Sequence, residues 1–149
     1  MSAWRRLFRR NDRGAAAVEF ALVCLPLLVL VSAIVQFGIA YNRQVTLTQS
    51  ARVGARLAAV CGAAVCSNGT DVAASTKSAA AGLDTSQMTL NFQYCPRPGT
   101  CNASPSYCPS GGATSGNQQL IITYPYQFLQ PVLTSSITIT GRASTPCGG

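Results

Sequence analysis

The residue types that perform most enzyme chemistry are scarce in this chain of 149 residues. Histidine is absent, which excludes Ser-His-Asp hydrolysis, Cys-His nucleophile pairs, HExxH zinc sites and any imidazole general base. The acidic residues are Asp12, Glu19, Asp71 and Asp84, so a site built on paired carboxylates would use nearly all of them. No GxGxxG, GxxxxGKS or GxxxxGKT motif occurs. The sequence argues against an enzyme and predicts no catalytic, cofactor-binding or metal-binding residues.

A different pattern joins Gly14 to Glu19, just before a long apolar run. If the chain were cut after Gly14, Ala15 would become a new amino terminus and Glu19 the fifth residue after the cut. A carboxylate at the centre of a bilayer costs about 2.5 to 3.5 kcal/mol, so Glu19 beside this run requires an explanation. The simpler one is that Glu19 marks the interface or favours the helix N-terminus through its dipole. The spacing instead favours a processing site.

The apolar run is long enough to cross a membrane as a helix. Residues 20–31 are all non-polar, and the apolar character continues to residue 40 with only Ser32 and Gln36 interrupting. These 21 residues match the roughly 20 that a spanning helix needs. Pro26 lies inside the run and predicts a kink or local unwinding.

The distribution of charge predicts an orientation for this span. The formal net charge is +7, and residues 1–14 hold five arginines against one acid. By the positive-inside rule, the N-terminus is cytoplasmic and the C-terminal part is exported. A secretory signal peptide is the competing interpretation, but its apolar region covers only about 7 to 15 residues before a cleavage site. We therefore expect a single membrane span that is retained in the protein.

Six of the seven cysteines fall on the predicted exported side, and Cys24 in the apolar run is expected to behave as a small apolar residue. The six are Cys61, Cys66, Cys95, Cys101, Cys108 and Cys147. An even number in an oxidising compartment predicts three disulfides, whose connectivity has 15 alternatives. Pairing Cys61 with Cys66 requires a helix to end near Gly62, since these positions lie about 140° apart around a helix. Zinc is the alternative, and it fits poorly without histidine or a CxxC pair.

Residues 41–60 predict a helix that continues from the membrane, with two stripes of side chains at helical spacing. One stripe holds Val45, Thr48, Arg52, Ala55 and Ala59, and the other holds Leu47, Ala51, Gly54 and Ala58. The small residues permit close packing, either on the sheet of this chain or on another subunit. Arg52 and Arg56 have no acid in reach along the helix, so we expect them to face solvent or a partner.

The remaining sequence predicts a second helix followed by strands. Residues 71–83 are rich in alanine and indicate a short helix. Residues 89–94, 119–126 and 136–142 alternate apolar and polar side chains as strands do, and residues 96–116 indicate a loop. Helices followed by strands predict an α+β fold, in which a long N-terminal helix carries a short helix and a small antiparallel sheet.

The start of the chain resembles the class III signal of type IV prepilins and pseudopilins, which a prepilin peptidase cuts on the cytoplasmic side. The resemblance rests on the basic leader, Gly14, Glu19 at the fifth position after it, Phe20 at the sixth, and the apolar run. Further segments are similar to the TadE-like (TadE/TadF) pilus-assembly pseudopilins, namely residues 13–22, 25–28, 36–38 and 52–60. Residues 124–129 and 137–140 are similar with less specificity. Cys24 and the cysteine-rich insert 95–108 depart from the pattern.

This resemblance implies a pilin-like fold and a non-catalytic minor pilin or pseudopilin that takes part in assembling a tight-adherence (Flp/Tad-type) type IV pilus. It implies processing between Gly14 and Ala15 and assembly through Glu19 and Phe20, with the Glu19 carboxylate neutralising the new amino group of an adjacent subunit. The implied partners are the bacterial inner membrane, a prepilin peptidase, other pilins or pseudopilins and the pilus assembly platform. No cofactor and no small-molecule substrate is implied.

We expect four regions: a basic cytoplasmic leader at residues 1–14, a transmembrane helix at 15–40, a continuing amphipathic helix at 41–60 and a periplasmic or cell-surface domain with disulfides at 61–149. The alternative function is a membrane-tethered extracytoplasmic adhesin or nucleic-acid-binding domain that never enters a filament. The exported basic residues are scattered and are not interleaved with aromatic residues as a strand-binding groove needs. Nucleic acid is therefore the weaker expectation.

Overall fold

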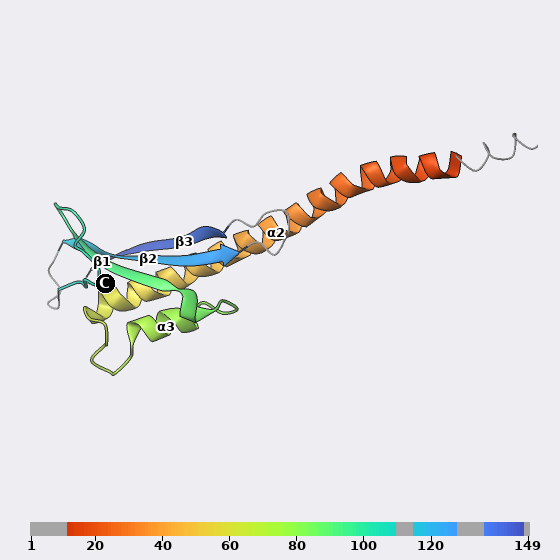
Figure 1. The fold of residues 1–149 in the computed structure, drawn as a ribbon. Helices are drawn as coiled ribbons and strands as arrows, with labels where there is room; N and C mark the ends of the chain where they lie inside the picture. Colours follow the sequence, from red (N-terminus) through yellow and green to blue (C-terminus); the bar gives the residue numbers. More distant parts are fainter. Residues whose placement is uncertain (1–11, 110–114, 128–135, 148–149) are drawn as a thin grey trace, which may run out of the picture. The chain divides into compact units, whose positions relative to one another are not determined.

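The computed structural model describes residues 12–109, 115–127 and 136–147. Its elements are α2 (Asp12–Cys61), α3 (Val72–Ser78), the 3-10 turn η1 (Thr85–Gln87), β1 (Thr89–Pro96), β2 (Gly116–Gln127) and β3 (Ser136–Pro146) (Figure 1). The chain divides into two compact units, one up to Gly38 and one from Ile39 onward, and α2 contributes to both. A long apolar N-terminal helix, a short helix and a small antiparallel sheet confirm the predicted α+β fold.

The described part of the first unit is the beginning of α2, where large apolar side chains point outward all around the helix. Phe20 is 72% exposed and Leu25 is 67% exposed. By length and composition, this part of α2 is a candidate membrane span. The sequence predicts a kink or local unwinding at Pro26. Residues on both sides of Pro26 are helical, so α2 is not unwound there.

The sheet of the second unit has the order β1-β2-β3, and both neighbouring pairs are antiparallel. The register places Phe92 opposite Leu120, and Leu120 opposite Ala143. Alternate side chains of the central strand β2 are buried, namely those of Gln118, Leu120, Ile122, Tyr124 and Tyr126. The sheet therefore has a core face and an outer face rich in Thr, Asn and Gln. All three strands confirm the prediction, and each extends beyond the expected segment.

The later part of α2 packs on the core face of this sheet. In Figure 1 the strands of the sheet run along that part of the helix. The whole stripe of Leu47, Ala51, Gly54 and Ala58 is buried, as are Ala55 and Ala59 of the other stripe. A Cβ added to Gly54 would overlap the side chains of Thr76 in α3 and Leu120 in β2. The small residues thus pack on the sheet of this chain, one of the two alternatives that the sequence left open. Val45, Arg52 and Arg56 remain exposed.

Helix α3 begins at an N-cap and is shorter than the sequence predicts. Asp71 accepts hydrogen bonds from the backbone N–H groups of Ala73 at 2.8 Å and Ala74 at 3.0 Å. The expected helix over residues 71–83 was too long at its C-terminal end, because α3 ends at Ser78. Tight-turn hydrogen bonds, from the N–H of residue 80 to the carbonyl of 77 and from 83 to 80, replace the helical pattern beyond that point.

The six cysteines that follow the apolar run form three disulfides: Cys61–Cys66, Cys95–Cys101 and Cys108–Cys147. The first pair depends on the end of α2 at Cys61, where Gly62 adopts φ 63° and donates its N–H to the Ala58 carbonyl at 3.0 Å. A glycine in the left-handed region is a common helix C-terminus, and the sequence predicted that the helix would end here. Cys24 is the free cysteine of the described residues.

Candidate processing and assembly site

Gly14 and Ala15 lie in the first turns of α2, and both residues are exposed. Apart from the backbone of its own helix, no described atom lies within 4 Å of a Cβ built on Gly14. A glycine inside a helix costs roughly 0.5 to 1 kcal/mol relative to alanine. The packing of the described residues therefore does not require a glycine at this position.

Glu19 lies five residues further along the same helix, which is about 7.5 Å along its axis. Its side chain is exposed and forms no hydrogen bond or ion pair with any described residue. The effect of the helix dipole falls off within the first turn, and Glu19 is the eighth residue of α2. The dipole therefore accounts poorly for this carboxylate in the uncut chain.

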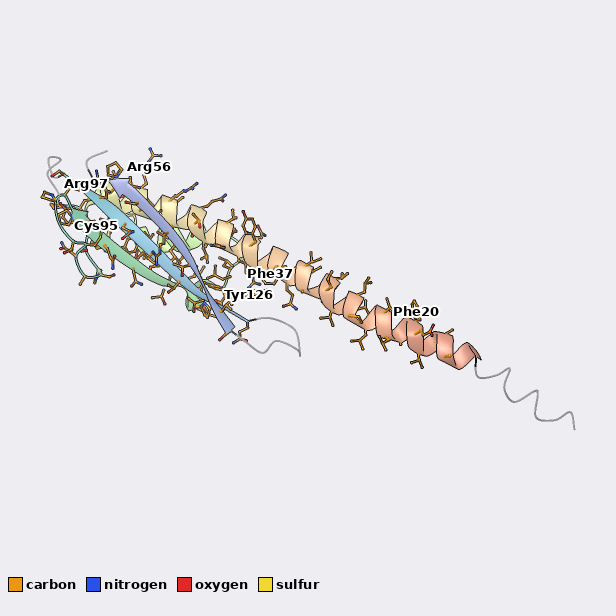
Figure 2. The ribbon with its side chains drawn as sticks, turned by 90° about the horizontal axis from the view of Figure 1, so that it is seen from above. Phe20, Phe37, Arg56, Cys95, Arg97 and Tyr126 are labelled. Carbon is orange, nitrogen blue, oxygen red and sulfur yellow. A yellow bond between two sulfur atoms is a disulfide. The ribbon has the colours of Figure 1, made fainter. Side chains whose placement is uncertain are left out.

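The surface beyond Glu19 is apolar, beginning with Phe20 (Figure 2). In lipid, an isolated carboxylate carries a large desolvation cost, and a positively charged partner offsets part of it. The arrangement can therefore form an ion pair with an amino group supplied by another chain. The four residues proposed for processing and assembly all lie on one short stretch of α2, whereas the three disulfides belong to the second unit.

Sequence reasoning missed the buried polar residues in the described part of the second unit, which are Ser50, Thr76 and Gln118. Gln118 has the most extensive role. Its Oε1 accepts a hydrogen bond from the Cys108 N–H at 2.9 Å, and its Nε2 donates to the Ser106 carbonyl at 3.0 Å. Gln118 is fully buried and thereby fixes the loop that carries the Cys108–Cys147 disulfide. Extending the alternation of β2 by one residue pair toward its start would have placed Gln118 on the core face.

Comparison with known proteins assigns the N-terminal part of the chain. The family model described as TadE-like protein matches residues 14–56. Residues 14–56 are therefore similar to the TadE-like family. The match confirms the resemblance to the TadE-like family over residues 14–56, whereas the prepilin signal stays a prediction. This TadE-like segment holds both the apolar helix and most of the helix that packs on the sheet. No curated protein and no solved structure matches the chain.

The TadE-like family is associated with the Tad pilus and is not enzymatic. The match therefore links residues 14–56 of this chain to a pilus-associated family. The exposed apolar helix within the TadE-like segment is consistent with a membrane-anchored protein.

Proposed function

We propose that this protein is a non-catalytic minor pilin or pseudopilin that takes part in assembling a tight-adherence type IV pilus. The observation that carries the proposal is the TadE-like match over residues 14–56, which begins at the glycine of the candidate processing site. The protein crosses the bacterial inner membrane once, with its N-terminus in the cytoplasm. Its second unit, with three disulfides, lies in the periplasm or at the cell surface, where an oxidising environment maintains them.

In this proposal a prepilin peptidase removes residues 1–14 and leaves Ala15 as the mature amino terminus. The accessibility of Gly14 supports this step, because no packed side chain blocks an approaching enzyme among the described residues. The Glu19 carboxylate, unpaired within the described chain, then neutralises the amino group of an adjacent subunit. Other pilins or pseudopilins and the assembly platform are the partners. Residues 15–40 form the transmembrane region, 41–60 the continuing helix and 61–149 the exported domain.

The mature N-terminus of the protein in membranes of piliated cells tests this function. We expect mass spectrometry of the purified protein to find Ala15 as the first residue, and we expect its loss when the prepilin peptidase is inactivated. A chain that retains residues 1–14 in piliated cells would overturn the processing step. A chain cut on the exported side of the apolar run would make the protein a secreted domain, such as an adhesin, and would overturn the pilin proposal.

A further inference from the structure

A groove of about 390 Å³ runs between the last turns of α2 and the end of β3. Its lining consists of Arg52, Arg56, Ala59 and Val60 from α2 and of Thr145 and Pro146 from β3. Both arginines are exposed, and the Arg56 side chain projects outward in Figure 2. Val60 is 64% exposed and adds an aliphatic side chain to the lining of the groove. A second hollow of about 300 Å³ follows the same helix from Tyr41 and shares Arg52 with the groove.

The arginines of this groove have no anionic partner within the described residues. Residues 39–149 contain two acids, Asp71 and Asp84. Asp71 caps α3 by accepting from the N–H groups of two following residues, and Asp84 accepts from the N–H and hydroxyl of Ser86. Neither Arg52 nor Arg56 forms an ion pair or hydrogen bond with a described residue. Two guanidinium groups therefore stand on one wall of a groove with their charge uncompensated.

The same facts argue against a second copy of this chain as the occupant. Within this unit a second copy would supply only the carboxylates of Asp71 and Asp84, and each already accepts hydrogen bonds as an N-cap. Packing the same face of two copies together would place arginine against arginine, and like charges across an interface cost several kcal/mol. We therefore expect the groove to bind a different protein and not a second copy of this chain.

We propose that this groove, lined by Arg52, Arg56, Val60 and Pro146, binds an acidic segment of a different protein that alternates carboxylate and aliphatic side chains. The guanidinium groups pair with the carboxylates, and the apolar lining of Ala59, Val60 and Pro146 takes the aliphatic groups. A nucleic acid fits less well, because the described lining of the groove offers no aromatic side chain for base stacking. This inference does not depend on cleavage after Gly14.

The test uses the full chain in a neutral detergent and a short fluorescent peptide of alternating glutamate and leucine. At low ionic strength we expect saturable binding by fluorescence anisotropy, which the double variant Arg52→Gln with Arg56→Gln weakens by at least about tenfold. The matched control, Arg142→Gln with Lys77→Gln, removes two positive charges elsewhere and should change affinity by less than about twofold. A peptide with glutamine in place of glutamate should not bind.

A second variant changes the groove without altering Arg52 or Arg56. Val60→Glu places a negative charge in the groove at an exposed position and should also abolish binding, with an unchanged circular dichroism spectrum as the folding control. Equal loss of binding in the control double variant, or no saturable binding, would overturn the proposal. Self-association that disappears in the Arg52 and Arg56 variant would assign the groove to a second copy. Tighter groove-dependent binding of a thymidine oligonucleotide would assign it to nucleic acid.

Discussion

Gly141 in β3 lies directly against the backbone of Leu47 in α2. A Cβ added to Gly141 would be 2.6 Å from the Leu47 carbonyl carbon and 2.7 Å from its oxygen, well inside contact distance. The atoms in the way are backbone, so they cannot move aside as a flexible side chain would. This glycine sets how closely the helix approaches the sheet, and small residues on the facing stripe of α2 continue that approach.

Replacing Gly141 should therefore loosen the helix from the sheet. We expect Gly141→Ala to lower the free energy of unfolding of the second unit by about 1 to 3 kcal/mol, because the added methyl forces the backbone apart. Ser144→Ala, an exposed position on the same strand, is the matched control and should change it by less than about 0.5 kcal/mol. Urea unfolding followed by circular dichroism measures both, and equal stabilities would contradict the close contact.

Gly14→Val should leave residues 1–14 attached to the protein. A peptidase that cuts here must bring its own groups close to the backbone, and a branched side chain obstructs that approach. Gly38→Val is the control, because Gly38 also lies in α2 with nothing within 4 Å of a built Cβ. Mass spectrometry should find the uncut chain for Gly14→Val and the cut chain for Gly38→Val. The same shortened product from both variants would remove the processing hypothesis.

Glu19→Gln should separate processing from assembly. The substitution keeps the shape and hydrogen-bonding capacity of the side chain and removes its charge, leaving the amino group of a neighbouring subunit unpaired at a cost of several kcal/mol. We expect this variant to insert in the membrane and to be largely cleaved, yet to co-fractionate with the pilus machinery at least about tenfold less.

Glu19→Asp, which retains the carboxylate, is the control and should recover part of the assembly. Normal surface piliation with Glu19→Gln as the only copy would reduce Glu19 to an interfacial residue at the helix start. Immunoblotting of the membrane fraction confirms that each variant is present before assembly is scored.

The disulfides predict a selective pattern of alkylation. Without reduction, a thiol reagent should label at most Cys24, because the other six cysteines are paired. Removing the Cys108–Cys147 bridge by paired serine substitutions should cost about 2 to 5 kcal/mol. Removing Cys95–Cys101 should cost less, since the bridged residues are 6 apart in sequence and not 39.

Peptide mapping after alkylation and urea unfolding of the two serine pairs make these measurements. Labelling of Cys95, Cys101 or Cys108 in the protein from the exported compartment would contradict the pairing. A larger loss of stability from the short bridge than from the long one would contradict the loop-length argument.

The carboxyl group of Asp84 should titrate at low pH. The Ser86 hydroxyl donates to it at 2.6 Å and the Ser86 N–H at 3.0 Å, and these bonds lower the pKa of Asp84 from its ordinary value. A lowered pKa in the folded chain means that this group adds stability above the pKa of the unfolded chain and that the contribution is lost as pH falls through the folded pKa. NMR titration should show a midpoint below that of ordinary aspartate, and Ser86→Ala should raise it. A wild-type midpoint at the ordinary value would be contrary evidence.

The sequence by itself determined those features that follow from local chemistry. A stretch of 21 residues that is apolar except for Ser32 and Gln36, behind an arginine-rich leader, predicts a spanning helix whatever the rest of the chain does, because lipid leaves the backbone few other choices. The alternation of residues 119–126 likewise predicted the strand β2 from neighbouring residues. Pairing of Cys61 with Cys66 required a helix end near Gly62, where α2 does end. Gly14 and Glu19 could be singled out because their significance lies in a spacing along one helix.

The tertiary structure decided what depends on segments far apart in the chain. The stripe holding Gly54 is buried because Thr76 and Leu120 come to meet it, and no pattern within α2 states that. The choice among 15 cysteine pairings also depends on the fold, since Cys108 and Cys147 are 39 residues apart and meet only when the sheet forms. The groove at Arg56 is of the same kind, because β3 supplies its second wall. Contacts of this kind depend on the packing of the whole second unit, which local propensity does not specify.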